Sequence, residues 1–118
     1  MSTRAQIVVT DSHGDKLWFY KHCDGYPEGT LPILEKFLQC VKDGKIRNNA
    51  MQGAGWLIVL GRDDSYKNEP ENTMYGWKVS DIEPCVPETH GDIEYLYVVD
   101  LVKKDIKTLT GSKASNYK

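Results

Sequence analysis

The sequence predicts one small α+β domain, an antiparallel sheet of four to five strands with two helices packed on one face. Strand-like stretches lie near both ends of the chain and helix-like stretches lie between them, in the order β-β-α-α-β-β. The length of 118 residues suits a single domain with one hydrophobic core. Hydrophobic residues make up 40% of the chain and charged residues 27%, which is typical of a globular protein.

The first two predicted strands form a β-hairpin. Residues 5–10 are rich in β-branched types, residues 17–20 are aromatic, and residues 11–15 between them form a Gly- and Asp-containing turn. Successive side chains of a strand point to opposite faces, which divides the second strand into two sets. One set is Leu17 and Phe19, and the other is Trp18, Tyr20 and His22.

A helix of about three turns is predicted to follow, because apolar side chains recur at spacings of three and four residues. Its N-cap is expected at Thr30, Pro32 suits its first turn, and it is expected to end near residues 43–44. The apolar side chains that carry this pattern are Leu31, Leu34, Phe37, Leu38 and Val41.

Residues 49–61 are compatible with a buried strand or a buried helix, because periodicity cannot separate the two in so short an apolar run. We favour a helix, since Gly61 would suit its C-cap and Ala50, Ala54, Leu57 and Ile58 share one helical face. The polar residues 62–73 are predicted to form a surface loop.

The second half of the chain predicts two further strands. Residues 75–79 alternate in the manner of a strand, and residues 83–92 contain two prolines and a glycine and predict a loop. Alternate residues of the stretch 93–101 point to opposite faces, and both sets contain apolar side chains. This pattern predicts a central strand that is covered on both faces. A short edge strand or turn is expected around residues 106–109.

Charge divides the chain into a domain over residues 1–102 and a lysine-rich C-terminal tail over residues 103–118. The tail carries five lysines and one acidic residue, whereas the preceding 102 residues carry 10 basic and 16 acidic side chains. An acidic body argues against a nucleic-acid binder, because phosphate contacts supply most of that affinity. We expect the tail to be a solvated, frayed terminus, with contact to an acidic partner as the alternative.

Cysteine usage and hydropathy predict a cytoplasmic protein. Cys23, Cys40 and Cys85 are odd in number and form no C-x-x-C pair, which fits a reducing compartment. No apolar run approaches the roughly 20 residues of a membrane helix, and no apolar signal-peptide segment follows Met1. The cysteine and histidine spacing matches no zinc finger or ribbon, and no phosphate-loop motif occurs, so no metal and no cofactor are predicted.

Each of the three histidines precedes an aspartate by two residues, as His13/Asp15, His22/Asp24 and His90/Asp92. In an extended strand, residues two apart share a face, so each pair has the geometry for acid–base chemistry or metal binding. The first and third pairs are His-Gly-Asp, however, and Gly-Asp is typical of turns. We therefore favour a turn for His13/Asp15 and for His90/Asp92.

Residues 20–27 join the second strand to the first helix and allow two interpretations. In one, His22, Asp24 and Tyr26 line a small polar pocket near a helix N-terminus, which favours anions. In the other, the segment is structural: Asp24 caps a turn, Gly25 supplies a positive φ and Pro27 directs the chain into the helix.

Three blocks of sequence together carry a resemblance: residues 20–29, residues 54–58, and residues 77–97 with His90-Gly91-Asp92-Ile93-Glu94-Tyr95. In this order they resemble a family of small uncharacterised prokaryotic and phage proteins with an H-x-D-G-Y-P motif and a later H-G-D-I-E-Y-x-Y strand. The resemblance implies a prokaryotic or phage setting and no catalytic residue. It also groups four side chains into one constellation: His22, Asp24, His90 and Asp92.

The candidate binding surface consists of Tyr20, His22, Asp24, Tyr26, His90 and Asp92. Our favoured hypothesis is a non-enzymatic binding or regulatory module that acts on a protein partner, because no complete catalytic motif occurs. The alternative is a small hydrolase or metal-assisted enzyme in which the histidines act as acid, base or ligand. This alternative requires the His22 and His90 side chains to lie within about 10 Å of one another, so that both reach one substrate group.

Overall fold

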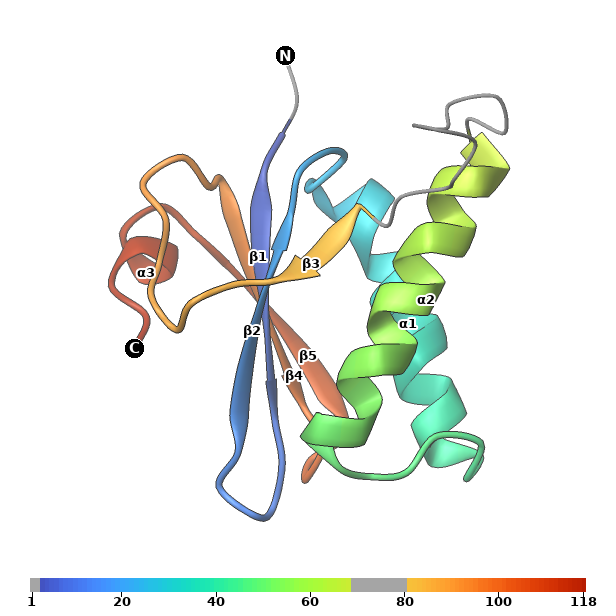
Figure 1. Cartoon of the computed structure of the whole chain (residues 1–118). Coiled ribbons are helices and arrows are strands. Elements are labelled where there is room, and N and C mark those ends of the chain that lie inside the picture. The colour runs from blue at the N-terminus through green and yellow to red at the C-terminus, as the bar shows by residue number, and fades with distance from the viewer. Residues whose placement is uncertain (1–2, 69–80) are drawn as a thin grey trace.

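A computed structural model of the chain describes residues 3–68 and 81–118, residues 63–68 by their backbone alone. The elements in chain order are β1 (Ala5–Thr10), β2 (Lys16–Lys21), α1 (Pro27–Lys42), α2 (Ala50–Asn68), β3 (Ile82–Pro84), β4 (Tyr95–Asp100), β5 (Asp105–Thr110) and α3 (Gly111–Ser115). Figure 1 shows the sheet in the middle, α1 and α2 on one side of it, and α3 on the other. The α+β class is therefore confirmed.

The sheet has five strands in the order β3-β2-β1-β4-β5 and is mixed, so the expectation of a purely antiparallel sheet is wrong. The pairs β1/β2, β2/β3 and β4/β5 are antiparallel, but the central pair β1/β4 is parallel. The reason is the connection from β3 to β4. Residues 85–94, which we call the crossover segment, pass over the sheet instead of turning back as a hairpin, so β3 and β4 run in the same direction.

The larger core lies between the sheet and the helices α1 and α2, on what we call the α1/α2 face. Phe37 and Leu57 of the helices pack there against Ile7, Phe19 and Tyr97 of the strands, and all five side chains are almost completely buried. The expected packing of both helices on one face is confirmed. Gly53 lies against the ring of Phe37, because a Cβ at this position would be 2.8 Å from Phe37 Cζ.

Helix α1 begins earlier than expected. Tyr26 is its N-cap residue and Pro27 occupies the first turn, whereas Pro32 lies inside the helix. Thr30 is not the cap; its hydroxyl donates to the main-chain oxygen of Asp24 at 2.9 Å. The other end agrees with the prediction, since Asp43 is the C-cap and Gly44 has a φ of 76°.

Helix α2 confirms the preference for a helix over a strand but runs further than expected. Gly61 is buried within the helix instead of ending it, and residues 62–68 continue it into the stretch that we predicted as a loop. The strand predicted at residues 75–79 lies outside the described residues. β3 lies partly within the predicted loop 83–92, where it pairs with β2 over three residues.

The opposite side of the sheet, the α3 face, is covered by the C-terminal residues and the crossover segment. Val8, Trp18 and Leu96 form a second, smaller buried cluster with Ala114 of α3. Residues 105–110 form an edge strand that pairs with β4 along its whole length, which confirms the edge strand expected around residues 106–109. The expectation that these residues belong to a frayed terminus is wrong. The prediction that β4 is covered on both faces is confirmed, because Leu96 and Tyr97 are both fully buried.

Candidate functional site

The fold brings four of the six candidate residues together on the α3 face. Tyr20 lies on the same side of β2 as Trp18, and His22 follows directly after the strand. His90 and Asp92 belong to the crossover segment, which passes over this face. We call Tyr20, His22, His90 and Asp92, together with Arg4 and Glu83, the histidine–tyrosine cluster.

Gln6 of β1 holds the crossover segment in place beneath the cluster. Its side chain is fully buried, donates to the main-chain oxygen of Glu88 at 2.9 Å and accepts from the main-chain N–H of His90 at 2.9 Å. Because both ends of one buried amide are used, the position of His90 relative to the sheet is well defined. Gln6 was not among the predicted site residues; its signal in the sequence is a polar residue within an otherwise apolar strand.

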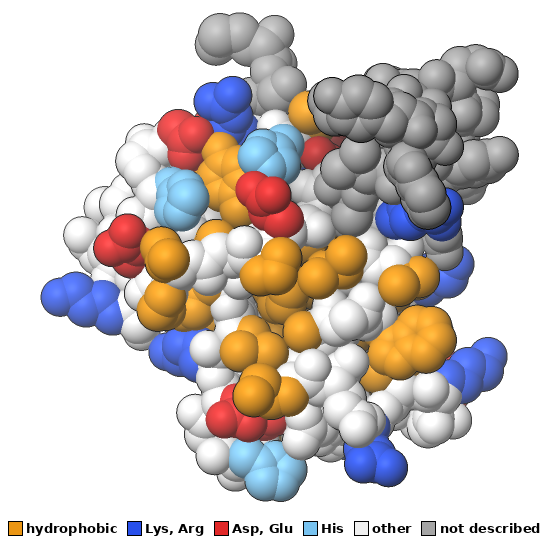
Figure 2. Space-filling model, viewed as in Figure 1, with side chains coloured by type: hydrophobic (Ala, Val, Ile, Leu, Met, Phe, Trp, Pro, Cys, Tyr) orange, Lys and Arg blue, Asp and Glu red, His pale blue; other side chains and the backbone are white. Residues whose placement is uncertain are grey.

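The Tyr20 ring is the centre of the cluster. Its centroid lies 4.7 Å from that of the His22 ring, in an edge-on arrangement, and 4.9 Å from that of the His90 ring. The two histidine rings therefore lie no further apart than the sum of these distances, which is within the limit of about 10 Å set by hydrogen-bond reach. In the view of Figure 2, two histidine side chains lie close together with acidic side chains beside them, and the third histidine lies far from both.

Charged side chains form hydrogen bonds and ion pairs at the edges of the cluster. The Tyr20 hydroxyl donates to Asp92 Oδ2 at 2.6 Å, and Arg4 Nη1 lies 3.4 Å from the same oxygen. His22 Nε2 lies 2.7 Å from Glu83 Oε1. Arg4 and Glu83 were not predicted, because each is brought to the site by strand pairing and not by a local motif.

The Tyr20–Asp92 contact moves the pKa values of both groups further from neutrality. Burial, followed by the hydrogen bond and the charge of Asp92, raises the pKa of Tyr20 to about 12. The hydrogen bond from Tyr20 lowers the pKa of Asp92 below its ordinary value. Tyr20 is therefore a hydrogen-bond donor and Asp92 a charged acceptor, and Tyr20 is not poised to act as a base or nucleophile.

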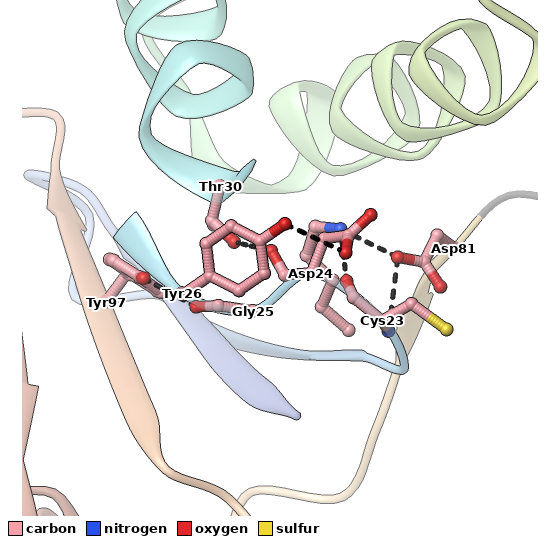
Figure 3. A network of polar contacts seen from close by, with 8 residues as sticks. Cys23, Asp24, Gly25, Tyr26, Thr30, Asp81 and Tyr97 are labelled. Carbon is pink, nitrogen blue, oxygen red and sulfur yellow. Dashed lines mark hydrogen bonds and ion pairs between the residues drawn. The ribbon is translucent and has the colours of Figure 1, made fainter. Parts of the chain in front are cut away.

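The two other candidates, Asp24 and Tyr26, belong to a separate turn between β2 and α1 (Figure 3). The Tyr26 hydroxyl donates to Asp24 Oδ1 at 3.1 Å, and the buried Tyr97 hydroxyl donates to the main-chain oxygen of Gly25 at 2.6 Å. These contacts match the structural interpretation of residues 20–27, with one correction. The positive φ of 53° belongs to Asp24, whereas Gly25 is needed because a Cβ there would lie 2.8 Å from Ala5 Cβ.

Lys21 is a buried cation that the sequence analysis did not single out. It lies on the α1/α2 face by the alternation of β2, and its side chain is almost completely buried. Its Nζ lies 2.7 Å from Asp81 Oδ2 and donates to the main-chain oxygen of Cys23 at 2.6 Å. These bonds connect the end of β2 to the start of β3, which indicates a structural role.

The pair His13/Asp15 lies in the β1–β2 turn, as favoured from its Gly-Asp chemistry. Gly14 has a φ of 83°, and the side chain of His13 is mostly exposed. The group that organises this turn is Asp11, whose Oδ1 accepts the main-chain N–H groups of His13 and Asp15. His13 therefore does not join the histidine–tyrosine cluster.

The cluster provides hydrogen-bonding and aromatic groups but no ready metal site. Within residues 3–68 and 81–118, no group of three or more His, Cys, Asp or Glu side chains is placed to hold a metal ion. Imidazole rings can donate and accept hydrogen bonds and also offer flat faces for stacking. The arrangement is thus suited to recognising a polar surface.

In the same described ranges, no helix combines the length and the apolar character needed to cross a membrane. Comparisons with protein-family models, curated proteins and solved structures found no match to this chain. The resemblance to the H-x-D-G-Y-P family therefore stays a prediction.

Proposed function

We propose that this chain is a non-enzymatic binding or regulatory module that contacts a protein partner through the histidine–tyrosine cluster. The observation that carries the proposal is the contact of two imidazole rings with one tyrosine ring. We further propose a prokaryotic or phage cytoplasm as its setting. The resemblance favours the prokaryotic or phage origin, and the cysteine usage favours a reducing compartment.

The composition of the cluster favours protein recognition. Arginine is one of the residue types enriched in the energetically important parts of interfaces, and Arg4 is about half exposed at the cluster. Here the buried Tyr20 ring packs against the two imidazole rings, while His22, Glu83, Arg4 and Asp92 are each about half exposed and form a charged rim. A rim of this kind steers and selects a partner more than it adds affinity.

The bonding of Tyr20 argues against covalent catalysis at the cluster. Its hydroxyl is already donated to Asp92 and its pKa is raised to about 12, so it is a poor nucleophile near neutral pH. The two pockets described for this structure have other residues in their walls. Neither of these two pockets would therefore bring a substrate to the cluster.

A hydrolase remains the second candidate, because one observation favours it. The His22–Glu83 pair has the geometry of a base held by a carboxylate, and His90 is near enough to act on the same group. In this case His22 is the base, Glu83 orients it, and His90 is the acid.

The test is affinity capture from the producing cells followed by a binding measurement with purified components. We compare the unmodified chain with His22→Ala/His90→Ala, and with His13→Ala as the matched control, because His13 is an exposed histidine outside the cluster. The partner's Kd should rise about tenfold or more in the double variant and stay unchanged in the control.

Equal affinity of all three proteins for the partner would contradict the proposed surface. Turnover of a small ester or phosphoester that is lost in His22→Ala and kept in His13→Ala would instead support the hydrolase. Circular dichroism of each variant confirms that the fold is retained.

A further inference from the structure

The two edges of the sheet differ in how well they are protected against pairing with a further strand. At one edge, β3 has three residues and ends at Pro84, and both its short length and the proline hinder pairing. At the other edge, β5 has six residues, contains no proline and pairs with β4 without a bulge. Within residues 3–68 and 81–118, β4 is the only strand that pairs with β5. The outer edge of β5 therefore offers main-chain N–H and C=O groups to a further strand.

A hollow of about 390 Å³ lies between β5 and α1, on the α1/α2 face, and we call it the β5 hollow. Its strand wall consists of Ile106 and Thr108, which are on this face because they pair with the core residues Val99 and Tyr97. Its helix wall is one stripe of α1, formed by Leu31, Glu35, Leu38, Gln39 and Lys42. Side chains of an added strand can pack in such a hollow while its main chain bonds to the edge.

The charges on the helix wall are complementary to those of a second copy of the same helix. The wall contains one acid, Glu35, and one base, Lys42, with Leu38 and Gln39 between them. The nearby Asp43 carboxylate accepts a hydrogen bond from Gln39 at 2.9 Å and does not line the hollow. Two copies of α1 related by a two-fold axis run antiparallel, so each Glu35 faces the partner's Lys42. A wall with no net charge favours this occupant over a strongly acidic or basic one.

The sequence of β5 selects the register in which two copies can pair. A two-fold axis perpendicular to the sheet keeps the helices of both copies on one side and makes the two β5 strands antiparallel. Because faces must match, the axis passes between two identical residues, and five residues of each strand pair only when these are Lys107 or Thr108. A centre at Lys107 places two lysines opposite one another, which is unfavourable. A centre at Thr108 places Lys107 opposite the partner's Leu109 and is therefore the favoured register.

We propose that two copies of this chain form a two-fold symmetric dimer by antiparallel pairing of their β5 strands, centred on Thr108. The pairing joins the two sheets into one, and each Glu35 forms an ion pair with the partner's Lys42 above the joined β5 hollows. This interface goes beyond the proposed function and does not depend on it, because β1 and β4 separate β5 from the strand that carries Tyr20. Substitution of both cluster histidines by alanine should therefore leave the dimer unchanged.

The test is sedimentation velocity of the purified full chain over concentrations from about 1 to 300 µM, a range that includes the Kd values of weak dimers. The unmodified chain should change from monomer to dimer within this range. NMR of the ¹⁵N-labelled chain over the same range locates the interface. The amide signals of Thr108 and Leu109 should shift with concentration, whereas those of His22 and His90 should not.

Two variants at the centre of the interface test the strand pairing. Thr108→Lys and Thr108→Glu each place like charges opposite one another and should raise the dimer Kd at least about tenfold. An equimolar mixture of the two variants should dimerise again, because opposite charges then face each other. Thr108 is exposed, so both variants should fold, and circular dichroism checks that they do. Trp56→Gln alters an exposed apolar residue of α2 and should leave the dimer unchanged.

A charge exchange tests the contact between the two α1 helices. Glu35→Lys and Lys42→Glu each bring like charges together and should raise the dimer Kd about three- to tenfold. The double variant Glu35→Lys/Lys42→Glu restores opposite charges across the axis and should recover most of the affinity. Lys36→Glu is the matched control, because Lys36 is exposed on α1 and does not line the β5 hollow.

Three results would overturn the proposal. The first is a chain that stays monomeric up to about 300 µM. The second is a dimer whose Kd is the same in both Thr108 variants as in the unmodified chain. The third is a dimer that is lost in Trp56→Gln and kept in Thr108→Lys, which would assign the interface to α2. None of these measurements involves a partner at the histidine–tyrosine cluster, so failure of this interface is distinguishable from failure of the proposed function.

Discussion

The two faces of the sheet differ in what covers them. Among the described residues, the buried cluster on the α1/α2 face contains sixteen hydrophobic side chains and the cluster on the α3 face contains four. The α1/α2 face is covered by helices of 16 and 19 residues, whereas α3 has five. The histidine–tyrosine cluster lies on the less covered face.

This difference shows how so small a domain combines stability with a site. Burial of apolar surface on one face supplies most of the driving force for folding, since that force scales with the apolar area removed from water. The other face then has room for polar and aromatic groups that would destabilise a core. Substitutions on the two faces should therefore differ in kind, with the largest losses of stability on the α1/α2 face.

The largest expected effect comes from Phe37→Ala. Phe37 is fully buried between α1, α2 and the sheet, and its truncation should lower the free energy of unfolding by about 4 kcal/mol. Leu109 is partly buried against the small apolar cluster on the α3 face, and Leu109→Ala should lower the free energy of unfolding by only about 1–2 kcal/mol. Urea denaturation measures both, and equal losses would break the comparison of the faces.

Asp11 should have the next largest effect, because it connects the hairpin to α2. Its buried carboxylate accepts three main-chain N–H groups, including that of Ala50 at 2.8 Å. Asp11→Ala leaves these donors unpaired and should cost about 2 kcal/mol. Asp11→Asn keeps an acceptor oxygen, so its free energy of unfolding should fall by less than that of Asp11→Ala. An equal fall in the two variants would contradict the role of Asp11 as an acceptor of these N–H groups.

Asp11 also predicts a dependence of stability on pH. The hydrogen bond from Ala50 lowers the pKa of Asp11 below its ordinary value of 3.8. A lowered pKa in the folded state gives a stabilisation that is present above pH 3.8 and is lost as the pH falls below it. The free energy of unfolding, measured by denaturation at pH 7 and in acid, should therefore fall less between the two conditions for Asp11→Asn than for the unmodified chain.

Substitution of two glycines of α2 by alanine should change the stability in opposite directions. Gly53→Ala places a Cβ 2.8 Å from Phe37 Cζ and should destabilise the fold by about 1 kcal/mol, despite its gain in helix propensity. Gly55 has no atom within 4 Å of a Cβ, and Gly55→Ala should stabilise by about 0.5–1 kcal/mol. Thermal unfolding of the two variants should give shifts in opposite directions, and equal shifts would contradict close packing at Gly53.

The smallest effect on stability is expected at the histidine–tyrosine cluster. Tyr20→Phe removes one hydrogen bond and should cost under about 1 kcal/mol at pH 7. Because the folded-state pKa of Tyr20 is raised to about 12 from 10.0, its stabilising contribution is complete below pH 10.0 and is lost as the pH rises towards 12. In Asp92→Asn the pKa of Tyr20, followed by ¹³C NMR, should fall because the hydrogen bond to a charged acceptor is lost; an unchanged value would contradict the pairing.

Local patterns in the sequence predicted several elements well. Apolar side chains at helical spacing identified α1, and alternation identified the hairpin and β4, because both signals depend on neighbours a few residues apart. The boundaries were less reliable. Gly61 resembles a helix terminator, but it is buried inside α2, where lack of a side chain is compatible with close packing.

The candidate site was predictable only in part. Tyr20 and His22 were found from one strand, and His90 and Asp92 from a second block, but their meeting depends on how the chain returns to the sheet. The Tyr20–Asp92 bond joins residues 72 positions apart, and the Arg4–Asp92 pair joins residues 88 apart. No local pattern reports such contacts.

The sequence by itself determined the α+β class, the order of most elements and which side chains of β2 share a face, because these follow from short-range periodicity. Only the tertiary structure decided the parallel pairing of β1 with β4, the crossover above the α3 face and the different partners of Asp24 and Asp92. These features depend on which buried groups pair across the sheet, as Gln6 does with the crossover segment, and long-range pairing is a property of the whole packed chain.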